Sequence, residues 1–246
     1  MRRIFPMAAL LIVLLPLLAQ AEGLPTITVG IGQAANPGQT STALQILLVL
    51  TVLSMAPAIL LMTTAFIRLV VVLSFVRQAM GTQQMPPNQI IIGLALFLTF
   101  FIMAPVFTQI NDRALQPYLA KKIGQEQALN EAVAPMREFM FKQTKEKELG
   151  LLMEIAGQPD PENQDQVPTM TLIPAFMLSE LKRAFQIGFM VYIPFLVIDM
   201  VVASVLMSMG MMMLPPVIIS LPFKLLLFVL VDGWNLVVGS LVQSFY

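Results

Sequence analysis

Five charged residues stand inside otherwise apolar stretches of this sequence, and their types set the chemistry that they could do: Arg68, Arg77, Asp199, Lys224 and Asp232. A charge at the centre of a membrane span costs about 2.5–3.5 kcal/mol, so each such residue is expected to have a function or a buried partner. Carboxylates and amines can relay protons or ions. Oppositely charged side chains can instead pair and fix the register of neighbouring helices.

Asp199 and Lys224 are the two residues whose spacing predicts a contact. If the chain reverses direction midway between them, at the turn 209–216, they lie opposite one another at the same depth. Both interpretations stay open: a proton or ion relay, or a buried structural pair. We favour the structural pair, because the neighbouring residues are mostly Leu, Val, Ile, Met and Phe, whereas transporter sites are usually built from polar, glycine-broken segments.

The composition removes most enzyme classes. The chain has no His and no Cys, so Ser-His-Asp triads, His/Cys zinc sites, haem ligation by His and thiol nucleophiles are excluded. Ser179 lies near Lys182, but no further motif of a Ser/Lys hydrolase accompanies them. The net charge of zero gives no support to nucleic-acid binding. We therefore expect no catalysis, no cofactor, no metal and no nucleic-acid partner.

The same composition is typical of a membrane protein. Of 246 residues, 57% are hydrophobic and only 14 + 14 = 28 are charged, where a soluble domain would have roughly 25% charged residues. Residues 112–165 hold 17 of these 28 charges. The chain thus reads as one soluble segment set between apolar ones.

The N-terminal 21 residues match a secretory signal peptide, with Arg2 and Arg3, a short apolar run and Ala19-Gln20-Ala21 at the cleavage site. We expect the mature chain to begin at Glu22. The alternative is an uncleaved membrane helix, although the apolar run is short for the ~20 residues that a span needs. Residues 22–42 then form a linker, uncharged from Leu24 onward, that begins outside the cytoplasm.

The remaining sequence predicts an all-α, membrane-associated fold of two long helical hairpins that flank an extracytoplasmic helical insert. The first hairpin is 43–111 and the insert is 112–173. A long helix that begins at Pro174 leads into the second hairpin, so that both lie within 174–246. Within the insert, Phe139 belongs to an apolar stripe at helical spacing, which needs a partner surface and predicts self-association.

The turns of the two hairpins share the pattern Met-Gly-x-x-x-[Met/Leu]-Pro-Pro, 129 residues apart, which indicates a weak internal repeat. The three middle residues are polar in the first turn (82–84) and are all methionine in the second (211–213). The three methionines either form a buried apolar turn or have a functional role, since flexible thioether side chains can conform to changing surfaces.

Several stretches resemble the FliP family of flagellar type III export-gate proteins, and together they cover nearly everything after the linker. They are Thr64–Arg68, Arg77–Gly81, Pro86–Gln89, Pro174–Phe176, Ser179–Lys182, Phe185–Phe189 and Asp199–Pro216.

The resemblance implies a structural subunit of a conical protein-export channel in the bacterial inner membrane, at the flagellar basal body. It implies a ring of about five copies that assembles with FliQ-like and FliR-like subunits, and an FlhB-like subunit is a further candidate partner. Unfolded flagellar proteins would be the substrates. The resemblance makes Glu180 a subunit contact beside Phe139, and it makes the second turn a pore gasket formed by Met209, Met211, Met212 and Met213. The rival function is a small-solute or ion transporter that uses Asp199 and Lys224.

Overall fold

The computed structural model describes residues 37–82, 85–159, 161, 163–211 and 213–246. The predicted signal peptide and the first residues of the linker lie outside this range. The described residues form helices and no strand, which confirms the all-α prediction. The chain divides into two compact units within its first described helix, after Ser54, and the second unit, Met55–Tyr246, holds every site discussed below.

The described residues form eleven helical segments between Pro37 and Gln243, of which nine are α-helical, one is π-helical and one is 3₁₀-helical. In chain order they are α2 (Pro37–Thr63), α3 (Phe66–Ala79), α4 (Asn88–Ile110), η2 (Asn111–Leu115), α5 (Gln116–Leu119), α6 (Gln125–Gln143), α7 (Glu146–Ile155), η3 (Gln164–Gln166), α8 (Thr169–Ser208), α9 (Pro216–Leu230) and α10 (Gly233–Gln243).

The first predicted hairpin contains three helices, because the apolar pattern that runs from α2 into α3 is broken at Thr64–Ala65. Threonine hydroxyls at the break bond to the helix backbone: Thr63 donates to the Ile59 carbonyl and Thr64 to the Leu61 carbonyl. Such bonds compete with regular helix geometry. Helix α2 also begins at Pro37, inside the range expected to be linker.

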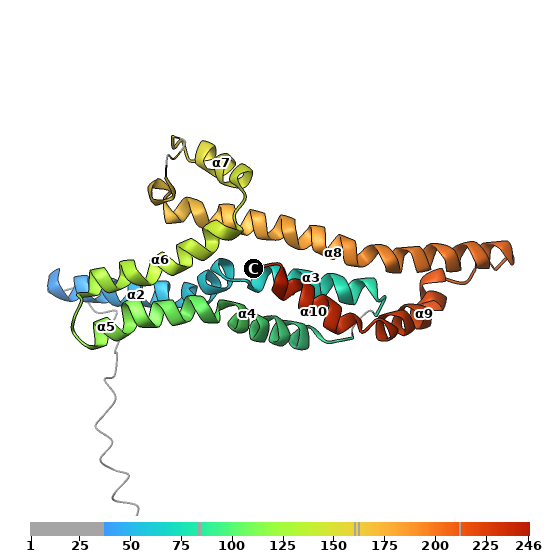
Figure 1. Ribbon diagram of the computed structural model, residues 1–246. Helices are drawn as coiled ribbons and strands as arrows, with labels where there is room; N and C mark the ends of the chain where they lie inside the picture. Colours follow the sequence, from blue (N-terminus) through green and yellow to red (C-terminus); the bar gives the residue numbers. More distant parts are fainter. Residues whose placement is uncertain (1–36, 83–84, 160, 162, 212) are drawn as a thin grey trace, which may run out of the picture. The chain divides into compact units, whose positions relative to one another are not determined.

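Helix α3 packs mainly along α8 (Figure 1). Its buried side chains recur at helical spacing, so one stripe faces the core. The stripe consists of Arg68, Leu69, Val72, Leu73, Val76 and Ala79.

Helix α8 begins at Thr169, five residues before the predicted start at Pro174. The prediction rested on the preference of proline for the first helical position. Pro168, with ψ 138°, ends the preceding loop instead. Pro174 lies in the second turn of the helix, where a proline removes one backbone hydrogen bond.

The insert packs against the first part of α8, where α7 and α6 both contact it (Figure 1). Beyond this region α8 continues to the turn at Met209, and α9 returns alongside it.

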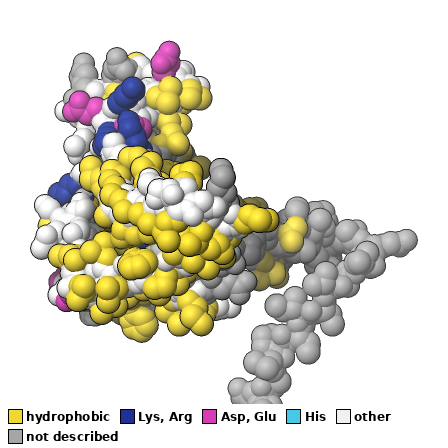
Figure 2. Space-filling model, turned by 90° about the vertical axis from the view of Figure 1, so that its right-hand side faces the viewer, with side chains coloured by type: hydrophobic (Ala, Val, Ile, Leu, Met, Phe, Trp, Pro, Cys, Tyr) yellow, Lys and Arg dark blue, Asp and Glu magenta, His cyan; other side chains and the backbone are white. Residues whose placement is uncertain are grey.

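Three described helical stretches are long and apolar enough to cross a membrane: Ile46–Thr63, Asn88–Leu119 and Thr169–Ser208. A fourth is formed if α9 and α10, which are bent by 63° at their junction, count as one span. Hydrophobic side chains cover most of the described surface that faces the viewer in Figure 2, and charged side chains gather at its top. The membrane-like character expected from the composition is confirmed.

Candidate functional site

The second hairpin brings Asp199 and Lys224 together. Asp199 lies on α8 and Lys224 on α9, and the Lys224 Nζ donates to Asp199 Oδ2 at 2.6 Å. The Ser220 hydroxyl donates to the other carboxylate oxygen. The Lys224 side chain is 3% exposed and that of Asp199 is 21% exposed. Both carboxylate oxygens are thus engaged, and the ammonium lies out of solvent.

A second ion pair joins Arg68 of α3 to Glu180 of α8, and both side chains are completely buried. Arg68 donates from Nε and from Nη2 to the two Glu180 oxygens. This bidentate geometry is the strongest form of an Arg–carboxylate contact. The sequence singled out both residues but assigned them separate roles.

Two further polar residues complete this cluster and were missed by the sequence analysis. Arg68 donates to Gln143 Oε1 and to the backbone carbonyl and hydroxyl of Ser244. The Gln143 amide in turn donates to the Phe245 carbonyl, and the Phe245 ring lies 3.7 Å from the Arg68 guanidinium carbon. Gln143 follows Phe139 by four residues and so shares its helix face. This spacing is the feature of the sequence that could have identified Gln143. No sequence pattern of this kind identifies Ser244.

Phe139 packs inside the same unit. Its ring lies 5.9 Å from that of Phe176 and stacks on that of Phe245 at 6.3 Å. The apolar stripe of α6 therefore has a partner surface within the chain. Because Phe139 and Glu180 are both buried, a subunit contact at this place would have to run through the exposed residues around them, and that role stays a prediction.

Arg77 and Asp232 lie at helix ends and contact neither ion pair. Arg77 donates to the Pro86 carbonyl and to the Asn88 side chain, and so closes the first turn. Asp232 separates α9 from α10 in the left-handed conformation, with φ 50°. Asp tolerates this region better than most residues do, and its carboxylate accepts a bond from Asn235.

The methionine turn is exposed in the single chain. Met209, Met211 and Met213 are 61%, 40% and 98% exposed, and Met212 lies outside the described residues. Gly210 has φ +75°, and the amide of Met211 donates to the Leu206 carbonyl. This is the Schellman ending of a helix, which turns the chain sharply. The buried-turn interpretation does not hold for the chain on its own.

The first turn, in contrast, is bound to itself. Gly81 has φ +76°, matching Gly210 in the proposed repeat. The Thr82 hydroxyl donates to the Met85 carbonyl, and Arg77 ties the last turn of α3 to the start of α4.

Ser179 and Lys182 are engaged in different contacts. The Ser179 hydroxyl accepts from the Lys145 amide, and Lys182 Nζ donates to Glu148 Oε1 at 2.7 Å. The hydrogen bond from Lys182 holds the pKa of Glu148 below its usual range. The other Glu148 oxygen is buried with no partner among the described residues. These contacts fasten α7 to α8.

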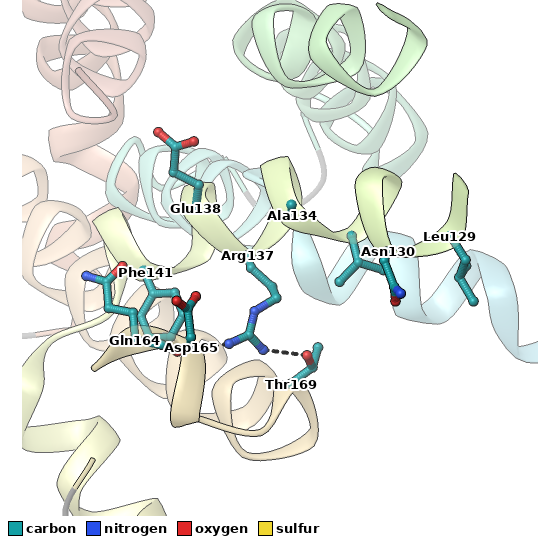
Figure 3. A pocket seen from close by; sticks show the side chains of 10 residues that line it. Leu129, Asn130, Ala134, Arg137, Glu138, Phe141, Gln164, Asp165 and Thr169 are labelled. Atoms are coloured by element: carbon teal, nitrogen blue, oxygen red, sulfur yellow. Dashed lines mark hydrogen bonds between the residues drawn. The ribbon is translucent and has the colours of Figure 1, made fainter. Parts of the chain in front are cut away.

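A hollow of about 570 Å³ in the insert lies between α6 and the segment 164–169 (Figure 3). Arg137 points across it and donates to the Thr169 hydroxyl and to the carbonyls of Gln164 and Val167. Because these bonds occupy the guanidinium, Arg137 acts as a structural anchor between α6 and α8. No group of three potential metal ligands occurs among the described residues.

These features define an all-α, membrane-type protein with two internal ion pairs and an exposed methionine turn. A family model described as the FliP family matches residues 49–241. The flagellar biosynthetic protein FliP of Bacillus subtilis (strain 168) is 59% identical over 217 residues, which are 88% of this chain and 98% of that protein.

Two further relatives carry the same name. FliP of Pectobacterium carotovorum subsp. carotovorum is 55% identical, over 86% of this chain and 82% of that protein. FliP of Aquifex aeolicus (strain VF5) is 50% identical, over 90% of this chain and 92% of that protein. The chain belongs to the FliP family.

Proposed function

We propose that the chain is a structural channel subunit of the flagellar type III protein export gate and forms, with partner subunits, the pore through which unfolded flagellar proteins leave. Membership of the FliP family carries the flagellar part of this proposal. The exposed methionine turn carries the pore part. The proposal assigns the chain no catalytic step and no cofactor.

The apolar surface of the second hairpin supports assembly within a membrane. Large apolar side chains stay exposed along α8, among them Phe185, Phe189, Ile193, Met200 and Val205. A monomeric soluble protein rarely leaves such a continuous apolar surface in water. Lipid or neighbouring subunits must therefore cover it.

The position and chemistry of the second turn support a closing role. Several copies arranged around one axis would bring Met209, Met211, Met212 and Met213 into a ring. Unbranched thioether side chains can close such a ring at rest and deform around a passing chain of any sequence. A rigid or polar ring could not do both.

The assembly that we propose is a ring of about five copies, joined by FliQ-like and FliR-like subunits and adjoining an FlhB-like subunit. It lies in the bacterial inner membrane at the flagellar basal body, with the insert 112–173 on the extracytoplasmic side. The charged insert, which holds most of the chain's ionisable residues, suits an aqueous compartment.

The transporter alternative rests on Asp199 and Lys224. Their geometry favours a structural pair, because Lys224 and Ser220 already satisfy both carboxylate oxygens. A relay would also need further titratable partners in reach. The next described carboxylate on α8 is Glu180, which is committed to Arg68.

Deletion of the gene, followed by complementation, tests the proposal. We expect loss of motility together with loss of secretion of external flagellar subunits, and recovery of both with the intact gene. Affinity purification should recover two small membrane proteins with the chain. Retained secretion in the deletion strain, or solute uptake by the purified chain reconstituted alone, would contradict the gate and favour the transporter.

A further inference from the structure

Gly81, in the first turn, lies against one face of α9. The atoms nearest to the position that a Cβ of Gly81 would occupy are Lys224 Nζ at 3.7 Å, Val217 Cγ1 at 3.9 Å and Leu221 Cδ1 at 4.0 Å. These three residues are spaced by four and three positions, so they share one helix face. We call this the turn–α9 contact. It joins the first hairpin to the second.

The Lys224 ammonium in this contact is bound to the Asp199 carboxylate of α8. Gly81 follows the end of α3 at Ala79 by two residues. Lys224 therefore pairs with α8 and also lies beside the turn that follows α3.

The first turn is well suited to bracing another element, because hydrogen bonds hold its described ends together. Arg77 and Thr82 both bond across it. The Gly81 backbone, at φ +76°, lets α9 approach without a side chain between them.

The corresponding glycine of the second turn has no such contact with the described residues: none of their atoms lies within 4 Å of a Cβ position at Gly210. The repeat offset of 129 residues also maps Asp199 and Lys224 onto Val70 and Ala95 of the first hairpin. The charge pair thus occurs in only one copy of the repeat. This copy is the second hairpin, against which the first turn packs.

We propose that the turn–α9 contact sets how far the methionine turn extends, which makes Gly81 and Lys224 positioning residues for pore closure. Lys224 lies about 12 Å of helix from the start of α9 at Pro216. The methionine turn ends just before that start, so a tilt of α9 moves the C-terminal end of the turn. This inference rests on the proposed closing role of the methionine turn.

Gly81→Asn is the first test, with Gly157→Asn as its matched control. Asn tolerates the left-handed backbone, so both variants keep the chain path at their positive φ values of 76° and 63°. Only the side chain at position 81 meets another element, since no described atom lies within 4 Å of a Cβ position at Gly157. We expect assembled complexes of Gly81→Asn to admit a membrane-impermeant dye several-fold faster than the parent, and those of Gly157→Asn to match the parent.

Val217→Ala, with Val229→Ala as control, tests the contact without a risk to folding. Both valines lie on α9 and are 50% and 75% exposed, but only Val217 touches the Gly81 position. A spin label on Met213→Cys, in a chain that has no other cysteine, reports copy-to-copy distances in the purified assembly. Val217→Ala should raise the leak and broaden these distances; Val229→Ala should change neither.

A reference variant, with Met211, Met212 and Met213 all replaced by Ala, separates the two proposals. If this variant does not leak, the closing role fails and the inference fails with it. If it leaks while Gly81→Asn and Val217→Ala keep parental leak and parental label distances, only the positioning inference is overturned. If Gly81→Asn does not assemble, Val217→Ala decides the question alone.

Discussion

The two internal ion pairs differ in depth and in what they join. Arg68 and Glu180 are both fully buried, and the Arg68 guanidinium contacts three further residues, Gln143 of α6 and Ser244 and Phe245 beyond α10. Asp199 and Lys224 link two consecutive helices, and the Asp199 side chain keeps 21% of its surface exposed. The Arg68–Glu180 pair thus joins α3 and α8 to α6 and to the residues that follow α10. The second pair fixes one hairpin and the turn placed against it.

This difference predicts a ranking of damage when each pair is broken. A charge left without its partner costs most where neither water nor a mobile side chain can replace that partner. Four ion pairs in the described part of the chain range from complete burial to more than half exposure of both side chains. Their removal should follow that order.

Breaking the Arg68–Glu180 pair should have the largest effect. Glu180→Gln or Arg68→Met leaves one buried charge uncompensated, at a cost of about 3–5 kcal/mol. We expect little or no assembled protein, as measured by native mass spectrometry of detergent extracts. The double variant should recover only in part, because the Ser244 carbonyl still loses its donor, whereas Gln143 keeps a hydrogen bond from Arg183. Normal yields from both single variants would contradict the junction role.

Asp199→Asn and Lys224→Met should each reduce assembly less severely. The expected loss of stability is about 3 kcal/mol, at the lower end of the range for breaking a buried ion pair. The Asp199 side chain is 21% exposed in the single chain, so its surroundings can adjust more than those of the fully buried pair. The double variant should recover nearly fully, since few other groups depend on this pair. Unimpaired single variants would show that the pair is not structural, whereas single variants that assemble but do not export would favour a relay.

The Glu148–Lys182 pair should give a smaller, pH-dependent effect. Because its folded-state pKa is lowered, Glu148 contributes stability that is full above the usual glutamate pKa of about 4.3. Below that value the unfolded state takes up a proton more readily than the folded state, so the contribution falls with pH. The protection factors of the α7 amides, which correct for the intrinsic pH dependence of exchange, should fall as the pH drops below about 4.3, and Glu148→Gln should remove this fall. Identical profiles for parent and variant would be the contrary result.

The exposed pair Glu138–Lys142 should matter least. Its side chains are 54% and 68% exposed, and the residues are four apart on α6. Such a pair contributes about 0.3–0.5 kcal/mol. Lys142→Gln should leave assembly yield and thermal stability close to the parental values. A loss as large as that of Asp199→Asn would break the ranking by burial.

The same comparison explains what could be predicted from the sequence. Asp199 and Lys224 are related by a single reversal of the chain, so hairpin geometry alone placed them at one depth. Arg68 and Glu180 are separated by 112 residues. Their contact depends on how α3 packs on α8, and no local sequence pattern predicts that packing. The break at Thr64–Ala65 was missed for a related reason, since apolar periodicity continues across it.

The central claim is that this FliP-family chain lines a pore that its methionine turn closes at rest. The most direct test is the conductance of the purified, assembled complex in a planar bilayer, with and without replacement of Met211, Met212 and Met213 by Ala. We predict that the parent complex is electrically silent and that the variant, assembled to the same mass, conducts small ions. A variant complex that assembles fully and stays as silent as the parent would contradict the claim.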